Sequence, residues 1–218
     1  WSNSLELIGR SVAASKAFGK GANGRPARVA SGAGTDHLVA DASTTIEDVI
    51  AAYEQQIAAV EAVGGQIILM ASRALAAVAR SADEYARVYD HVLSQVREPV
   101  IIHWLGDMFD PALAGYWGDA DLDRATDVAV EVLNRNAAKV DGVKVSLLNK
   151  DREVAMRARL APGIRMYTGD DFNYAELIAG DGVGTTANHR QSDALLGIFD
   201  AIAPAANAAL AALARGEL

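Results

Sequence analysis

Short apolar runs alternate along the chain with longer segments in which apolar residues recur at helical spacing. The short runs contain β-branched residues, most have the length of buried parallel strands, and several follow Gly or Pro. Strands are predicted over 27–31, 66–71, 99–104, 142–147, 164–168 and 183–187.

The longer segments have the periodicity and the start signals of amphipathic helices. Thr44 or Thr45 can cap the second of them, and Ser81 is followed three residues later by Glu84, which is a capping-box pattern. Pro204 is expected to kink or split the last, Ala-rich helix. Helices are predicted over 4–18, 44–63, 81–96, 119–139 and 190–215.

Successive strands are about 31 residues apart, which is the length of a β–α–β unit and the pitch of a (β/α)8 TIM barrel. A doubly wound sheet would have similar spacing, but "SGAGTD" at 31–36 only weakly matches its Gly-rich phosphate turn. We therefore predict an α/β chain with one barrel domain over 1–218. These residues would form strands 3–8 and helices 2–8 of the eight-unit barrel. The first two strands and first helix are then expected before Trp1 or from another chain.

Composition narrows the function further. The 218 residues are 51% hydrophobic and can bury a sizeable core, and the net charge is −8 with 20 basic and 28 acidic residues. This balance, without a basic block, argues against nucleic acid as a partner. The chain has no Cys, which excludes disulfides and thiolate metal sites. It has no apolar run of about 18 residues and no charged-then-apolar leader, so we expect a cytoplasmic protein without a membrane span.

Lys144 is the most conspicuous polar residue, because it interrupts an apolar strand where a charge is costly. Alternate strand residues face opposite sides, so Val143, Val145 and Leu147 would face the outer helices. Lys144 and Ser146 would face the barrel interior near the carboxyl end, where barrel active sites lie. A buried amine has a lowered pKa and becomes a nucleophile for carbonyls. The alternative is a lysine that extends to solvent or pairs with a carboxylate.

Several stretches resemble one enzyme superfamily. They are "SGAGTD" (31–36), "EPVIIHWLGD" (98–107), "DGVKVSLLNKDRE" (141–153) and "YTGDDFNYAELIAGDGVGTTAN" (167–188). From about Arg28 to Leu210 the chain resembles the dihydrodipicolinate synthase / N-acetylneuraminate lyase superfamily, closest to an uncharacterised dihydrodipicolinate synthase-like branch. Residues 142–144 match its G-[IV]-K, 168–171 match its S-G-D-D, and 184–188 match its strand-eight segment. The resemblance implies that Lys144 forms a Schiff base with a 2-oxo acid or related carbonyl substrate.

The chain departs from that superfamily in two places. His103 occupies the position of the Tyr that relays protons, a role that imidazole can also perform near neutral pH. The G-T-T-G-E segment that binds the substrate carboxylate has no counterpart, which leaves the 2-oxo acid class open. The alternative for His103 is a core histidine bonded to a backbone carbonyl.

Other polar residues at predicted strand ends are candidate substrate contacts. They are Ser72, Arg73, Ser146, Asn188 and His189. Arg73 could bind a carboxylate or phosphate, or could start a helix in solvent. The segment from 106 to 123 has the length of a lid, and its aromatics Phe109, Tyr116 and Trp117 could cover a substrate or pack against another subunit.

Our main hypothesis is a class I aldolase or lyase with Lys144 and His103 as catalytic residues. It requires no cofactor and no metal, and by resemblance a homo-oligomer is expected. A second hypothesis is a metal-dependent lyase or hydrolase that uses residues at strand ends. Those residues are Asp36, His37, His103, Asp107, Asp170 and His189. A third is a barrel remnant with a binding or assembly role.

Overall fold

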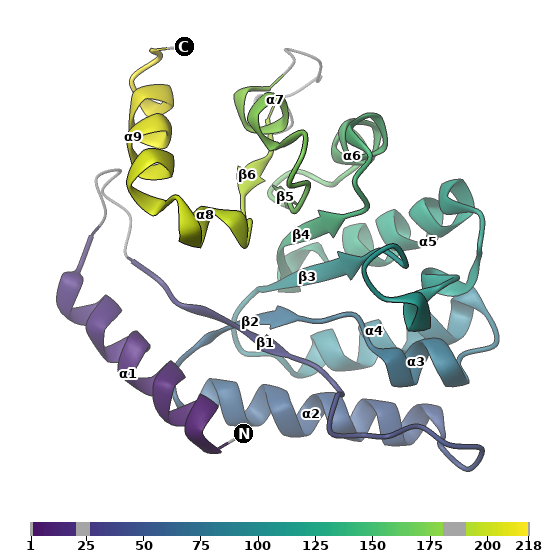
Figure 1. Cartoon of the computed structure of the whole chain (residues 1–218). Coiled ribbons are helices and arrows are strands. Elements are labelled where there is room, and N and C mark those ends of the chain that lie inside the picture. Colours follow the sequence, from purple (N-terminus) through teal and green to yellow (C-terminus); the bar gives the residue numbers. More distant parts are fainter. Residues whose placement is uncertain (1, 21–26, 181–190, 218) are drawn as a thin grey trace.

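The protein, seen in a computed structural model that describes residues 2–20, 27–180 and 191–217, contains one parallel sheet (Figure 1). Each of its six strands pairs with the next one along the chain, in the order β1 to β6. Doubly wound sheets reverse their strand order at a switch point, whereas consecutive units of a (β/α)8 barrel do not. The predicted α/β barrel class is therefore confirmed for the described strands. They are β1 (Ala30–Ala33), β2 (Gln66–Leu69), β3 (Val100–Leu105), β4 (Val140–Ser146), β5 (Arg165–Thr168) and β6 (Asp193–Ala194).

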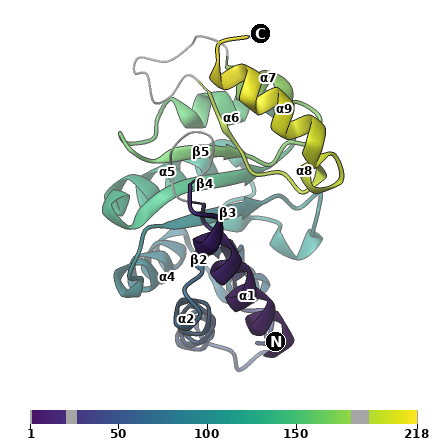
Figure 2. The same ribbon diagram turned by 90° about the vertical axis from the view of Figure 1, so that its left-hand side faces the viewer.

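The helices that connect the strands follow the outer side of the curved sheet (Figure 2). Within the described residues, no helix is long and apolar enough to cross a membrane. The α-helices are α1 (Ser2–Phe18), α2 (Ile46–Ala62), α3 (Arg73–Val78), α4 (Ala82–Gln95), α5 (Leu122–Arg135), α6 (Lys150–Arg157), α7 (Tyr174–Ala179), α8 (Ile198–Ala201) and α9 (Ala203–Ala214). Short 3-10 turns are η1 (Pro111–Leu113), η2 (Tyr116–Gly118) and η3 (Ala137–Lys139).

The helix starts follow from local sequence. Thr45 caps α2 in a complete capping box, in which its Oγ1 accepts from the Asp48 N–H at 3.2 Å and Asp48 accepts from the Thr45 N–H at 2.9 Å. Ser81 caps α4 by accepting from the Glu84 N–H. The Glu84 carboxylate accepts instead from the N–H of Arg80, one residue before the cap. Both predicted start signals are confirmed.

One predicted strand differs from the structure, and another is not tested by it. The first strand lies at Ala30–Ala33 rather than 27–31, because its register is set by pairing with β2 from Ala30 opposite Gln66 to Ala33 opposite Leu69. The strand predicted over 183–187 lies outside the described residues.

The Ala-rich segment predicted as one helix over 190–215 contains three elements instead. They are β6, α8 and α9. The break between the two helices precedes Pro204, which occupies the second position of α9. At that position the N–H that proline lacks would have no partner in the helix anyway. The predicted split at Pro204 is confirmed.

The core fills the layer between the sheet and the outer helices. Val143, Val145 and Leu147 of the predicted outward row are all buried in it. Trp104 and Trp117 are also buried there, at 2% and 0% exposure. This placement corrects the lid hypothesis for Trp117, whose ring stacks on Tyr89 of α4 at 4.6 Å between centroids.

A chain of hydroxyl groups fixes the carboxyl ends of β1 and β2. Tyr116 accepts from the Ser72 N–H at 3.0 Å and shares a 2.9 Å hydrogen bond with the Tyr89 hydroxyl. Ser72 Oγ lies 2.6 Å from Thr35 Oγ1 and caps α3 by accepting from the Leu75 N–H. Tyr116 is therefore a buried structural residue that holds two strand ends together, and not a lid residue.

Replacing Tyr116 with Phe should leave the buried Ser72 N–H without its acceptor. We expect the free energy of unfolding to fall by about 1–3 kcal/mol, measured by urea denaturation. Tyr85→Phe is the matched control, because Tyr85 is also buried and its ring packs edge-on against Tyr116, but its hydroxyl is not part of this chain. Equal losses in the two variants would contradict the structural role of the Tyr116 hydroxyl.

Candidate active site on the inner face of the sheet

One row of side chains crosses four strands on the inner face of the sheet. In register, His103 of β3 lies opposite Lys144 of β4, Lys144 opposite Tyr167 of β5, and Tyr167 opposite Asp193 of β6. Adjacent strands are about 4.8 Å apart, so these side chains are immediate neighbours. The structure therefore brings the two predicted catalytic residues, Lys144 and His103, side by side.

Two glycines make space for the Lys144 side chain. A Cβ on Gly169, which follows β5, would stand within 3.0 Å of both Lys144 Cε and Ser146 Oγ. A Cβ on Gly142 would stand 2.6 Å from the ring of Tyr167. The lysine stem thus passes beside Gly169, with the Tyr167 ring next to it on the side of the strands' amino ends. This gives a physical reason for the glycines in "GVK" and "TGDD".

The amine of Lys144 is partly buried. Burial lowers the pKa of Lys144 below its ordinary value, and the nearby Asp171 carboxylate opposes part of this shift. A lowered pKa increases the fraction of neutral amine near pH 7, which is the form that attacks carbonyls.

His103 is buried, with 6% of its surface exposed. Burial, and to a smaller degree the charge of Lys144, lowers the pKa of His103 to about 3. The imidazole is therefore neutral at pH 7. Its Nε2 lies 3.1 Å from Ser146 Oγ, on the next strand, so the two groups share a hydrogen bond in which either can donate. The alternative of a core histidine bonded to a backbone carbonyl does not describe this contact.

The remaining predicted contacts lie elsewhere. Ser72 is fully buried and occupied as the α3 cap. Arg73 forms ion pairs with Asp36 at 2.8 Å and Asp110 at 2.5 Å, which joins the loops after β1 and β3. Asn188 and His189 lie outside the described residues.

The donors named for a metal site do not cluster among the described residues, and His189 lies outside them. His37 Nδ1 pairs with Gln56 Nε2 at 2.9 Å, and His103 faces Ser146. Asp170 accepts from the N–H groups of Phe172 and Asn173 and so stabilises the turn that leads into α7. In the described ranges, no three His, Asp or Glu side chains come together as a potential metal site.

Sequence reasoning missed a buried polar cluster behind β5. Glu153 of α6 accepts from Ser192 Oγ at 2.7 Å and Thr168 Oγ1 at 3.1 Å, and Arg157 donates to Ser192 Oγ at 3.2 Å. Burial raises the pKa of Glu153 to about 7. The signal was present in the sequence, because Glu153 and Arg157 share one face of α6 with buried Met156.

A second group missed by the sequence reasoning lies beneath Lys144. Tyr167 donates to Asp141 Oδ2 at 2.6 Å, and Arg165 pairs with Asp141 Oδ1 at 2.5 Å. Asp141 can face the inner side because β4 has a register irregularity there, where Val100 pairs with Val140 but Ile101 pairs with Gly142. A local bulge of this kind leaves no pattern in one sequence.

A family model matches residues 1–218. The chain belongs to the DUF993 family, described as "Protein of unknown function". No curated protein matches the sequence of this DUF993 chain. Among solved structures it is similar to one from Pseudomonas aeruginosa described as a "putative dihydrodipicolinate synthetase", with 13% identity and a TM-score of 0.48. The match covers 76% of the DUF993 chain and 45% of the other, so the chain spans less than half of that protein's length.

His103 and Glu153 should make the stability of the DUF993 chain depend on pH in opposite directions. The folded pKa of His103, about 3, lies below its ordinary 6.5, so its contribution is complete above pH 6.5 and is lost as the pH falls toward 3. The folded pKa of Glu153, about 7, lies above its ordinary 4.5, so its contribution is complete below pH 4.5 and is lost as the pH rises to 7. Each slope is at most about 1.4 kcal/mol per pH unit.

Between pH 4.5 and 6.5 the two slopes partly cancel. Glu153→Gln should make the free energy of unfolding rise more steeply with pH than in the wild type, and His103→Asn should make it rise less or fall. Urea denaturation at half-unit pH steps measures both slopes. Parallel curves for the three proteins would contradict the assigned protonation states.

Proposed function

We propose that this protein is a class I lyase or aldolase that binds a carbonyl substrate as an imine on Lys144. The observation that carries the proposal is the position of this amine. It is partly buried on the inner row of a parallel sheet, beside a neutral imidazole and a hydroxyl. The resemblance of "GVK" and "TGDD" to the dihydrodipicolinate synthase / N-acetylneuraminate lyase superfamily supports the same chemistry.

The reaction begins with attack of the neutral Lys144 Nζ on the carbonyl carbon. The carbinolamine then loses water to form the imine, whose protonated form withdraws electrons from the adjacent carbon. A C–C bond or a C–H bond at that carbon can then break, with the electron pair moving into an enamine. Hydrolysis of the imine releases product and restores the amine.

His103 and Ser146 would carry the protons of these steps. The charge of Lys144 contributes to the low pKa of His103, and the protonated imine keeps that charge on the lysine nitrogen. Transfer of a proton from the adjacent carbon to His103 gives a neutral enamine, so the positive charge beside the imidazole disappears in the step in which the imidazole acts as the base. Ser146 Oγ is close to both groups, since it bonds to His103 Nε2 and lies beside Gly169, as Lys144 Cε does.

The imine can be tested by reductive trapping. Incubation with pyruvate and sodium borohydride should convert Lys144 to N-carboxyethyl-lysine, identified by peptide mass spectrometry. Lys144→Arg should abolish the adduct. Lys150→Arg should not, because Lys150 is on the surface of α6 in an ion pair with Glu176.

Hydroxyacetone serves as a second probe, which carries no carboxylate. Trapping with hydroxyacetone alone would point to keto-sugar-like substrates. Trapping of neither probe on Lys144, with the fold intact by circular dichroism, would contradict the proposal. If a chelator then abolishes the enzyme's activity, the result would favour the alternative of a metal-dependent lyase or hydrolase.

The proton-transfer role of His103 has a separate test. In D₂O the enzyme should exchange the methyl protons of pyruvate for deuterium, since imine and enamine interconvert through a base. His103→Gln should retain trapping on Lys144 but lower the exchange rate by about 10²–10⁴-fold, measured by proton NMR. Ser146→Ala should lower the exchange rate in the same direction. An unchanged exchange rate in His103→Gln would show that another group moves the proton.

A further inference from the structure

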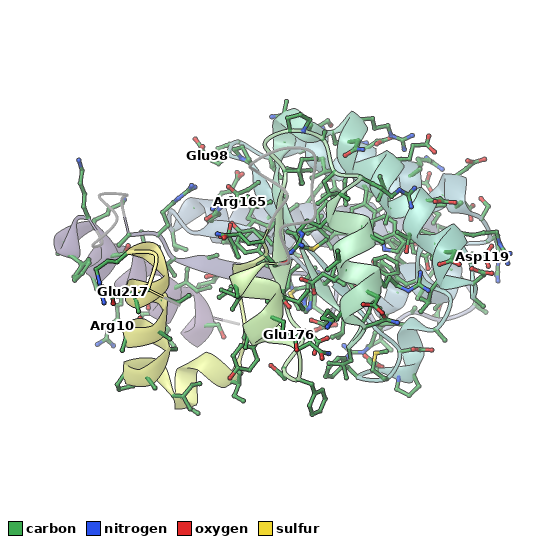
Figure 3. All side chains as sticks on the ribbon, turned by 90° about the horizontal axis from the view of Figure 1, so that it is seen from above. Arg10, Glu98, Asp119, Arg165, Glu176 and Glu217 are labelled. Carbon is green, nitrogen blue, oxygen red and sulfur yellow. The ribbon has the colours of Figure 1, made fainter. Side chains whose placement is uncertain are left out.

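The inner face of the sheet changes character along β5. Arg165, near the amino end of the strand, keeps 36% of its side chain exposed, whereas Tyr167, two residues on, is only 8% exposed. Figure 3 shows Arg165 on the amino-end side of the molecule, far from Asp119 beyond the carboxyl ends. Tyr167 therefore stands between the amine of Lys144 and the more solvent-exposed region around Arg165 at the amino ends of the strands.

The Tyr167 ring is held in place from three sides. Its edge lies over Gly142, where a Cβ would be 2.6 Å from the ring. Its hydroxyl donates to Asp141 Oδ2 at 2.6 Å, and the Arg165 guanidinium carbon lies 5.3 Å from the ring centroid. Burial and the Asp141 carboxylate raise the pKa of Tyr167 above its ordinary value, so the hydroxyl stays protonated and donates to Asp141.

We propose that Tyr167 forms a floor beneath Lys144, and that this floor excludes water from the amine and keeps it reactive. Tyr167 is thus a positioning residue, which acts through Lys144 and does not react with the substrate. The inference rests on the proposed function for its purpose, but the environment of the amine can be measured independently of any substrate.

The charged groups around Lys144 do not provide an alternative explanation for a reactive amine. Asp171 favours the charged ammonium, and His103 is neutral. Below the ring, Arg165 is paired with Asp141 at 2.5 Å and lies 3.7 Å from Asp193. The two carboxylates offset the guanidinium, so exclusion of water remains the main influence that favours the neutral amine.

The test is the pH dependence of Lys144 acetylation by acetic anhydride, followed by peptide mass spectrometry with Lys150 as internal reference. Tyr167→Ala should raise the pKa of Lys144 and thereby lower its acetylation at pH 8 by about tenfold relative to wild type. Tyr167→Phe keeps the ring and should leave the Lys144 profile unchanged. Circular dichroism and the unchanged Lys150 profile establish that each variant is folded.

If Tyr167→Ala does not fold, Tyr167→Leu replaces it, because leucine leaves part of the floor open while filling most of the space. An unchanged Lys144 profile in the folded Ala or Leu variant would overturn the proposal. An equal shift in Tyr167→Phe would overturn it too, since the hydroxyl and not the ring would then control the amine. If pyruvate is not trapped on Lys144 but the pH profile of Lys144 acetylation still depends on Tyr167, only the proposed function is refuted.

Discussion

The partial burial of one amine, that of Lys144, is the constraint around which the candidate site is organised. An ammonium group loses hydration energy on burial, so the sheet can tolerate Lys144 on its inner face because the amine can become neutral. Glycine at positions 142 and 169 makes this arrangement possible. One admits the Tyr167 ring and the other admits the lysine stem. Larger residues at either position would displace the groups that define the environment of the amine.

The same constraint connects the neighbouring strands. His103, Lys144 and Tyr167 lie in register on three adjacent strands, so a shift of one strand by one residue would turn its side chain to the outer helices. Register is held on the other side of the sheet by the buried row that includes Val143 and Val145. Packing of the core thus positions the side chains of the candidate site on the inner face.

Much of this arrangement could be predicted from sequence because it follows from local periodicity. The capping box at Thr45, the Ser81 cap and the two faces of β4 are determined by residues close together in the chain. The strand at Ala30–Ala33 was misplaced because pairing with β2 fixes it. The sequence suggested that Tyr116 and Trp117 could belong to a lid. Both are buried because they pack against Tyr89 of α4, a contact with an earlier helix that the local sequence does not reveal. Asp141 and Glu153 were missed since a bulge and a buried ion cluster are tertiary features.

The central claim is that Lys144 carries an amine with a lowered pKa. The most direct measurement is an NMR titration of the protein with ¹³C-labelled lysine, in which the Lys144 signal is assigned by comparison with Lys144→Arg. The account predicts that the Lys144 Cε shift titrates with a pKa below 10.5, the ordinary lysine value. A Lys144 signal that titrates at or above 10.5 in the folded protein would contradict it.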